Sequence, residues 1–462
     1  MQQTLPKKLL EGLEGIEGFD RKNFEAVHES GEQITSIRFN PEKFQHLVPG
    51  KNYYHPSFKL GEQVPWCEHG SYLSERPSFT LDPLLHAGAY YVQEASSMFL
   101  WEVLRRTAGA GSNVKVLDLC AAPGGKSSLL ASWFMNGLVV SNEVIKSRVS
   151  ILYENMTKWG ASNVVVTNNE AADFQRLKNY FDVIVVDAPC SGSGLFRKDP
   201  DAIGEWSENM VELCSQRQQK IVSDIFPSLK EEGILIYSTC SYSPEEDEEI
   251  SDWLKDHFPV DSIQLNLDPE WNIVETRSSK HHAFGYRFWP HKINGEGFFI
   301  AAFRKSEAAF ENSKQRRASL RKTGASESSL VANFLCTEVD CFLFSQNENI
   351  HAIKAAWEGD IALLQKTLYL KKAGIRVGQI KGNQLVPNHE LALSTIVNKN
   401  VQRTALSRDE ALQYLRKKEL DITGVSGGWA LCTCYNFPLG WVKFLHNRVN
   451  NYYPTEWRIL KH

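Results

Sequence analysis

Short runs of apolar, β-branched residues recur along the middle of the chain, and helix-compatible segments separate them. Strands that alternate with helices predict a parallel sheet that carries helices on both faces. We therefore expect an α/β fold with a mostly parallel, doubly wound sheet between residues 76 and 305. Its strands are expected at 114–119, 138–143, 164–167, 181–186, 233–237 and 297–303.

The segments on either side of this region differ from it in pattern. Residues 1–75 combine a helix-like start with an alternating strand, which predicts a small N-terminal α/β module. Basic residues followed by serine, glycine and alanine predict an exposed basic linker over 306–329. We expect a second small α/β segment over 330–400. Residues 401–462 alternate glycine and proline turns with short strands, which predicts a compact β-rich end.

Composition excludes several classes of protein. The chain has 462 residues and a formal net charge of −4, so any contact with nucleic acid has to come from local basic patches. Its apolar runs are well below the roughly 18–20 residues of a membrane span, and its first residues lack the apolar core of a signal peptide. The nine cysteines show no disulfide framework. We expect a reduced, cytoplasmic protein with reactive thiols and no membrane partner.

Two cysteines follow expected strands. Cys190 ends the motif Asp187-Ala188-Pro189-Cys190, and Cys240 lies in Ser238-Thr239-Cys240-Ser241. Because ligands bind at the carboxyl ends of the strands in an open α/β sheet, both thiols are expected to point into one cleft. Such a pair suits an enzyme that attacks a weak electrophile covalently and later releases it.

A glycine-rich turn follows the first expected strand and precedes a helix-compatible run. Small residues allow close approach of a ligand to the backbone, and Glu143, about twenty residues on, suits the hydroxyls of a ribose. The turn matches neither phosphate-binding pattern, Gly-x-x-x-x-Gly-Lys-Ser/Thr or Gly-x-Gly-x-x-Gly. It therefore favours a nucleoside without a pyrophosphate, such as S-adenosylmethionine, over NAD or ATP. The turn consists of Cys120, Ala121, Ala122, Pro123, Gly124, Gly125 and Lys126.

Together these motifs resemble the Nop2/Sun (RsmF/Fmu-type) family of RNA 5-methylcytosine methyltransferases. The resemblance rests on 120–126, 187–192 and 238–241 in this order, and on 88–98, which is similar to the segment before the catalytic sheet of that family. Arg197-Lys198-Asp199-Pro200 and Asn451-Tyr452-Tyr453-Pro454 are similar to the RsmF-type branch with its PUA-like tail. The resemblance implies a class I (Rossmann-like) methyltransferase fold, S-adenosylmethionine as cofactor and RNA as substrate. It also implies that residues 1–75 position RNA and that 401–462 bind it.

The resemblance also implies roles for the cysteines. Cys240 becomes the nucleophile, Cys190 the residue needed for product release, and Asp187 a residue that serves both the cofactor cleft and the base. C5 of cytosine is a poor nucleophile, and addition of a thiolate to C6 makes C5 enamine-like, so that it can attack a methyl sulfonium. Asp187 could share a proton with N3 of the base, a role that needs a pKa raised by burial. Since the methyl group comes from the cofactor, no metal is required.

Further cofactor contacts are implied by the same resemblance. Glu143 and Glu170 would hold the ribose and adenine ends, and Arg148 is a further candidate for the cofactor site. Asp173 competes with Glu170 for the adenine end, and the sequence leaves this choice open.

Several other residues allow two interpretations. Lys126 either reaches the cleft or caps its helix in solvent. Arg197 and Lys198 are expected to meet RNA phosphate, with a solvated loop as the alternative. The acidic run 245–249 is expected to be solvent-exposed, at a helix N-terminus. The basic cluster 314–322 is either an RNA-backbone contact or a solvated linker.

The motifs and the resemblance thus predict an S-adenosylmethionine-dependent RNA cytosine-C5 methyltransferase. The resemblance to the RsmF-type branch implies 16S ribosomal RNA as substrate, with transfer RNA as the alternative. Two other classes stay open. A non-catalytic RNA-binding ribosome-assembly factor could keep the fold without turnover. A DNA cytosine methyltransferase would use the Pro189-Cys190 motif for its nucleophile, so the thiol that traps the base distinguishes it from the RNA type.

Overall fold

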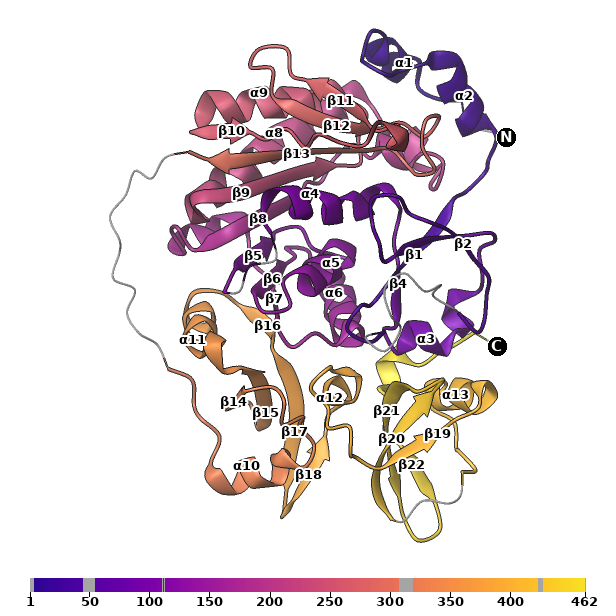
Figure 1. Ribbon diagram of the computed structural model, residues 1–462, viewed down its shortest axis with the longest axis vertical. Coiled ribbons are helices and arrows are strands. Elements are labelled where there is room, and N and C mark those ends of the chain that lie inside the picture. The colour runs from indigo at the N-terminus through magenta and orange to yellow at the C-terminus, as the bar shows by residue number, and fades with distance from the viewer. Residues whose placement is uncertain are drawn as a thin grey trace.

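The central part of the molecule is a ten-stranded sheet with a parallel centre (Figure 1). The computed structural model describes residues 4–44, 55–109, 111, 113–306, 319–422 and 427–461. Five strands run parallel in the order β9-β8-β5-β6-β7, and the apolar runs of the sequence form them. These strands are β5 (Lys115–Asp118), β6 (Leu138–Asn142), β7 (Val164–Thr167), β8 (Phe181–Asp187) and β9 (Leu229–Thr239).

Antiparallel strands extend this parallel centre on both sides, so the sheet is mixed. Beside β9 follow β13 (Phe298–Lys305), β12 (Phe284–Phe288) and β11 (Val274–Arg277), and β10 (Val260–Ser262) pairs with β13. On the other side β16 (Leu370–Ala373) pairs with β7. The α/β prediction is confirmed. The sheet contains more antiparallel strands than expected, because the alternation of side chains along a strand does not show whether its neighbour runs parallel or antiparallel.

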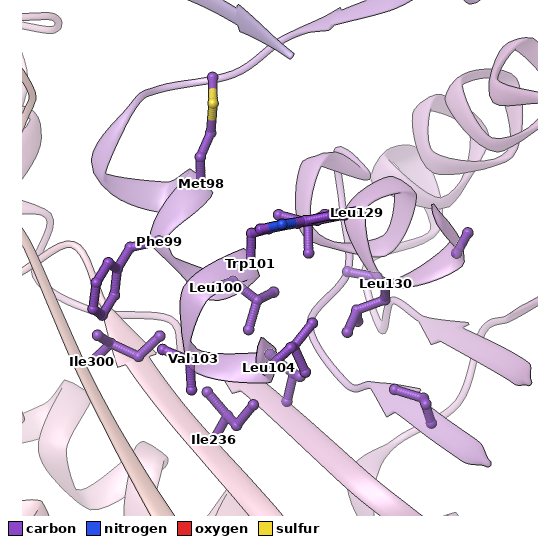
Figure 2. Close-up of a cluster of buried hydrophobic side chains, with 14 of the residues drawn as sticks. Met98, Phe99, Leu100, Trp101, Val103, Leu104, Leu129, Leu130, Ile236 and Ile300 are labelled. Carbon is purple, nitrogen blue, oxygen red and sulfur yellow. The ribbon is translucent and has the colours of Figure 1, made fainter. Parts of the chain in front are cut away.

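Helices cover both faces because alternate strand residues are apolar on both sides. Val116 belongs to the core on one face and its neighbour Leu117 to the core on the other. Figure 2 shows Leu100 and Leu104 of α4 on the first face, near Ile236 of β9. That face carries α4 (Leu100–Thr107), α5 (Gly125–Trp133) and α6 (Lys146–Trp159), and the other carries α8 (Glu208–Ile225), α9 (Glu248–His257) and α11 (Glu358–Thr367).

The N-terminal residues pack in two places. A four-stranded sheet of order β2-β3-β1-β4 reaches past residue 75 to its last strand. The first two helices lie away from it, near β11 and β12 (Figure 1), where their leucines pack with Phe24 against Phe196, Tyr242 and Trp289. The elements are α1 (Lys7–Leu13), α2 (Arg21–Glu29), β1 (Thr35–Phe39), β2 (Leu60–Gln63), β3 (Gly70–Leu73), α3 (Pro83–His86) and β4 (Tyr90–Val92).

The segment after the expected linker is joined to the ten-stranded sheet through β16. The basic residues Lys314, Arg316 and Arg317 of the expected linker lie in 307–318, outside the described residues. A helix begins at Ala325, within the range 306–329 that was expected to be a linker. A second sheet has the order β14-β15-β17-β18. The elements are α10 (Ala325–Ala332), β14 (Cys341–Gln346), β15 (Asn349–Lys354), β17 (Ile375–Lys381), β18 (Gln384–Pro387) and α12 (His389–Leu393).

The C-terminal residues form a four-stranded sheet of order β19-β20-β21-β22, as the β-rich prediction requires. Cys432 and Cys434 are buried in β20, and the described residues contain no group of three or more side chains suited to hold a metal ion. Among the described helices none is long and apolar enough to cross a membrane. The elements are β19 (Arg403–Ala405), α13 (Arg408–Leu415), β20 (Gly428–Cys434), β21 (Phe437–Phe444) and β22 (Val449–Asn451).

Candidate active site

The two cysteines meet at the carboxyl ends of two adjacent parallel strands. β8 and β9 pair so that Asp187 lies opposite Ser238, and each strand is followed by a short loop that carries a cysteine. The Sγ atoms of Cys190 and Cys240 are 3.1 Å apart. The structure therefore places both thiols at one point of the sheet edge where ligands bind in such folds.

Close backbone contacts fix the loop of Cys240. The Gly194 amide donates to the carbonyl of Cys240 at 2.8 Å, and the Gly297 amide donates to the carbonyl of Gly194 at 3.2 Å. A Cβ atom on Gly194 would lie 2.5 Å from the Gly297 carbonyl oxygen and 2.8 Å from that of Cys240. A side chain at position 194 would thus displace the backbone that carries the thiol.

Lys126 reaches the same edge and pairs with Asp187. Its Nζ lies 2.8 Å from Oδ1 of Asp187, which also accepts a hydrogen bond of 2.8 Å from the hydroxyl of Ser238. The ammonium lies 5.0 Å from the ring centre of Phe298. Of the two interpretations of Lys126, the structure supports the one in which the side chain enters the cleft.

The surroundings of two cysteines at this site raise their pKa values. The hydrogen bond with Cys240 and burial raise the pKa of Cys190 well above its ordinary value. Burial, together with the nearby carboxylates of Asp118 and Asp187, also raises the pKa of Cys120. Both groups are therefore held as neutral thiols at neutral pH.

The glycine-rich turn is supported by side chains from α6. It leads into α5 through Gly124, whose φ of 116° is accessible to glycine. Arg148 donates to the carbonyl of Ala122 at 2.6 Å, and Asn155 donates to the carbonyl of Pro123 at 2.8 Å. Arg148 therefore holds the turn in place, in addition to lying beside the carboxylate of Glu143.

Glu143 has an acceptor atom available for a ligand. Its side chain is buried, and Oε1 accepts from the amide of Ile145 at 2.9 Å. Oε2 lies 3.5 Å from Nη1 of Arg148 and has no hydrogen-bond partner among the described residues. A buried carboxylate oxygen without a donor, beside a turn of small residues, fits the hydroxyl groups of a cofactor ribose.

The two candidates for the adenine end lie at the start of the same short turn. Glu170 directly follows the loop after β7 and is exposed. Asp173 instead accepts a hydrogen bond from the Glu170 amide at 3.2 Å and pairs with Arg176. The Glu170 side chain in turn accepts from the Asp173 amide, so both carboxylates cap the same turn and the assignment of the adenine end stays a prediction.

Two expectations about charged residues are wrong. The Arg197 side chain is 3% exposed and forms an ion pair with Glu296 at 3.0 Å, so it does not offer its charge to RNA phosphate. In the acidic run, Glu246 and Asp247 are 0% exposed. Polarity alone predicts exposure at both sites, because it does not record the neutral hydroxyl donors of the acidic residues or the Glu296 partner of Arg197, 99 positions away. The sequence held one signal of a buried carboxylate near the cysteines. A serine follows each cysteine, and a serine hydroxyl can donate a hydrogen bond to such a carboxylate.

The fold and the site define an S-adenosylmethionine-dependent methyltransferase of class I. Three family models match the chain: the 16S rRNA methyltransferase RsmB/F over residues 110–304, the N-terminal domain of 16S rRNA methyltransferase RsmF over 5–95, and the methyltransferase RsmF PUA domain over 401–459. The chain belongs to the ribosomal RNA small subunit methyltransferase F family.

Named relatives support this assignment over most of the chain. The ribosomal RNA small subunit methyltransferase F of Psychromonas ingrahamii is 30% identical over 443 residues, which cover 92% of this chain and 90% of that protein. The protein of that name from Escherichia coli O139:H28 is 31% identical over 424 residues, 85% of this chain and 84% of the relative. A crystal structure of a methyltransferase homolog from Pyrococcus horikoshii has a TM-score of 0.51 at 28% identity, covering 65% of this chain and 100% of that one. The predicted family, fold class and cofactor are confirmed.

Proposed function

We propose that this protein transfers a methyl group from S-adenosylmethionine to C5 of a cytosine in RNA through a covalent bond between Cys240 and C6. The observation that carries the proposal is the 3.1 Å separation of the Cys190 and Cys240 thiols, beside the turn that would hold the cofactor. The names of the relatives support the ribosomal RNA of the small subunit as substrate. The PUA-type tail supports an RNA rather than a DNA substrate.

The chain's own residues account for the steps on the base. The Cys240 thiolate adds to C6, and the electron pair of the C5–C6 double bond becomes available at C5. The Asp187 carboxyl group, which Lys126 and Ser238 position, carries a proton that it donates to N3 as charge moves into the ring and takes back when the bond between C6 and sulfur breaks. When bound, S-adenosylmethionine supplies the methyl group, and its site would be formed by residues 120–126, Glu143, Arg148 and Glu170.

Release of the product requires two further events. The C5 proton leaves to water, and the bond between C6 and sulfur breaks with its electron pair returning to the sulfur of Cys240. Cys190 lies 3.1 Å from that sulfur and is held as a neutral thiol, so it donates its proton to the departing thiolate. This assigns nucleophilic attack and release to different cysteines.

The test is methyl transfer from labelled S-adenosylmethionine to total RNA from cells that lack this enzyme. We expect label in one ribosomal RNA with the wild-type protein, no label with Cys240→Ala, and a stable RNA–protein adduct with Cys190→Ala. Normal transfer by Cys240→Ala would contradict the assigned nucleophile. Label in small RNA would move the substrate to transfer RNA, and cofactor binding without any transfer would favour the assembly-factor alternative.

A second measurement separates the RNA-type from the DNA-type arrangement. An RNA oligonucleotide with 5-fluorocytosine at the target position traps the attacking thiol, because the C5 substituent cannot leave as a proton. We expect peptide mass spectrometry to find the adduct on Cys240. An adduct on Cys190 would instead assign the nucleophile to the Pro-Cys motif.

A further inference from the structure

The carboxylate of Glu246 is buried between the two cysteine loops, although it belongs to an acidic run. It lies in the turn Pro244–Glu246 that precedes α9. Oε1 accepts hydrogen bonds from the Ser191 amide at 2.8 Å and from Nε2 of Gln218 at 3.0 Å. Oε2 accepts from the hydroxyls of Ser191 at 2.5 Å and of Ser241 at 2.6 Å. A carboxylate has about four lone-pair sites, so these donors occupy them all.

The serine donors are the immediate neighbours of the two reactive cysteines. Ser191 follows Cys190 and Ser241 follows Cys240. The same carboxylate oxygen accepts from both hydroxyls, which lie 3.3 Å apart. A displacement of one cysteine loop relative to the other would therefore break a hydrogen bond to Glu246.

Gln218 connects this arrangement to helix α8. Its amide nitrogen donates both to Glu246 and to the carbonyl of Pro189 at 3.1 Å, directly before Cys190. Gln218 is itself 0% exposed. The carboxylate therefore links both cysteine loops to a long helix that is packed in the core.

All the donors to Glu246 are neutral groups, and this makes its burial costly. Burial raises the pKa of the carboxyl group, while its hydrogen bonds to Ser191, Ser241 and Gln218 oppose that change. With no cationic partner among these described donors, the carboxylate depends on its four hydrogen bonds to offset the cost of its burial. Its charge also contributes to the raised pKa of Cys190, after the hydrogen bond with Cys240 and burial.

We propose that Glu246 is a positioning residue of the transfer reaction, which holds Cys190 and Cys240 at their close separation through the serines that follow them. The inference rests on the proposed function, because both thiols take part in it. Displacements of about 1 Å in a reacting group can cost about 100-fold in rate. Attack by Cys240 and release through Cys190 both depend on this separation.

The separation of the thiols can be measured without RNA or cofactor. In glutathione buffers Cys190 and Cys240 lose two protons and two electrons and form one S–S bond, while oxidised glutathione takes them up and becomes two reduced molecules. The equilibrium constant reports how well the protein holds the two sulfurs together, and peptide mass spectrometry identifies the bonded pair. We expect Glu246→Gln to lower this constant at least about tenfold, since the amide keeps the size of the side chain but loses two acceptor sites.

The same variant is then tested in the transfer reaction. We expect kcat to fall about 10- to 100-fold, while the dissociation constant of S-adenosylmethionine and the KM for RNA stay within about twofold. This split is expected because the hydrogen bonds of Glu246 go to the cysteine loops and α8 and not to the glycine-rich turn.

Asp252→Asn is the matched control. Asp252 is a buried carboxylate of α9 that also accepts several hydrogen bonds, but from the amides of Lys280 at 2.9 Å and His281 at 2.8 Å, away from the cysteine loops. It should leave the thiol equilibrium and kcat unchanged. A folded Glu246→Gln protein with an unchanged equilibrium constant and kcat would overturn the proposal.

Two milder variants replace Glu246→Gln if that protein does not fold. Ser191→Ala and Ser241→Ala each remove one hydroxyl donor, and each should lower the thiol equilibrium constant by a smaller factor. Unchanged constants in both would overturn the proposal. A wild-type protein that transfers no methyl group would contradict the proposed function, and the thiol equilibrium would still decide the positioning by Glu246.

Discussion

Asp118, at the end of β5, is a buried carboxyl group next to the glycine-rich turn, and its protonation depends on pH near neutrality. It accepts a hydrogen bond of 2.6 Å from the Ser127 hydroxyl, and its Oδ1 has no partner within the described residues. Burial raises its pKa from an ordinary 3.8 to about 7. The folded protein therefore prefers the neutral acid over a wider range of pH than the unfolded chain does.

This shift predicts a pH-dependent difference between the wild type and Asp118→Asn. An acid whose pKa is higher in the folded state costs stability as pH rises, here between about pH 4 and pH 7, and the asparagine variant lacks this loss. We expect the free energy of unfolding of the variant relative to wild type to rise over that range, by at most about 4 kcal/mol, and to be constant above it. Urea unfolding of both proteins at several pH values measures this difference in free energy. A difference that stays the same at every pH would contradict the prediction.

Residue-scale chemistry could be predicted where a reactive side chain directly follows a strand. Cys190 and Cys240 both come shortly after strands whose carboxyl ends share one edge, so spacing was enough to bring them together, whereas the sequence left the position of Lys126 open. Glu246 and Arg197 could not be placed in this way. Arg197 is paired with Glu296, 99 positions away, and two of the four donors to Glu246 come from Ser191, 55 positions away, so no local pattern reveals that these charges are buried.

β16 is the element that joins the segment after the linker to the methyltransferase sheet. It pairs with β7, and a buried ion pair secures the junction: Lys372 of β16 and Glu390 of α12 are 1% and 4% exposed. Glu390 also accepts hydrogen bonds from the hydroxyl of Tyr153 on α6 and from the amide of Arg376. One carboxylate therefore connects three elements from two parts of the chain.

Glu390→Gln is expected to destabilise this junction strongly. It leaves the ammonium of Lys372 buried without a counter-charge, which typically costs about 3–5 kcal/mol. We expect the free energy of unfolding in urea to fall by about 3 kcal/mol and hydrogen exchange to accelerate first in β16. Glu338→Gln is the control, because its pair with Lys399 is exposed and should contribute less than about 1 kcal/mol. Equal effects of the two variants would contradict the assigned role of the buried pair.

At the element scale the sequence predicts the parallel strands but not the sheet edges. Each of the five central strands contains an apolar run, as expected for strands buried on both faces. β16 is only four residues long, Leu370–Ala373, and two of these are lysines. Its partner β7 ends some 200 residues earlier, so no local pattern reveals the pairing.

The whole molecule is built from parts that share their hydrophobic cores. Leu431 and Trp441 of the C-terminal tail belong to the core of residues 331–397, and Ala87 of the N-terminal part belongs to the core of the tail. A cavity of about 880 Å³ lies where these parts meet, with Asn163, just before β7, among its lining residues. This is the amino-terminal edge of the parallel strands, so the cavity is distinct from the cysteine site at the carboxyl-terminal edge.

Shared cores predict one cooperative transition for these parts. Trp441 is 1% exposed and donates to the carbonyl of Asn388 at 2.9 Å, so Trp441→Ala should cost about 3–5 kcal/mol. We expect calorimetry to show a single transition at lower temperature for this variant. The matched control Leu460→Ala changes a side chain that is 74% exposed and should leave the transition in place. A tail that melts separately while the remaining transition is unmoved would contradict the shared core.

The docking of α1 and α2 has a consequence for biosynthesis. These helices are translated early, whereas Tyr242 and Trp289, which stack at a ring separation of 5.4 Å in the same cluster, are translated much later. At about 5–20 residues per second, the roughly 260 residues in between take some 13–50 s. During that interval the leucines of α1 and the ring of Phe24 cannot pack as they do in the folded protein, because Tyr242 and Trp289 have not yet been synthesised. The aromatic support behind the Cys240 loop is therefore completed only after most of the methyltransferase sheet has been synthesised.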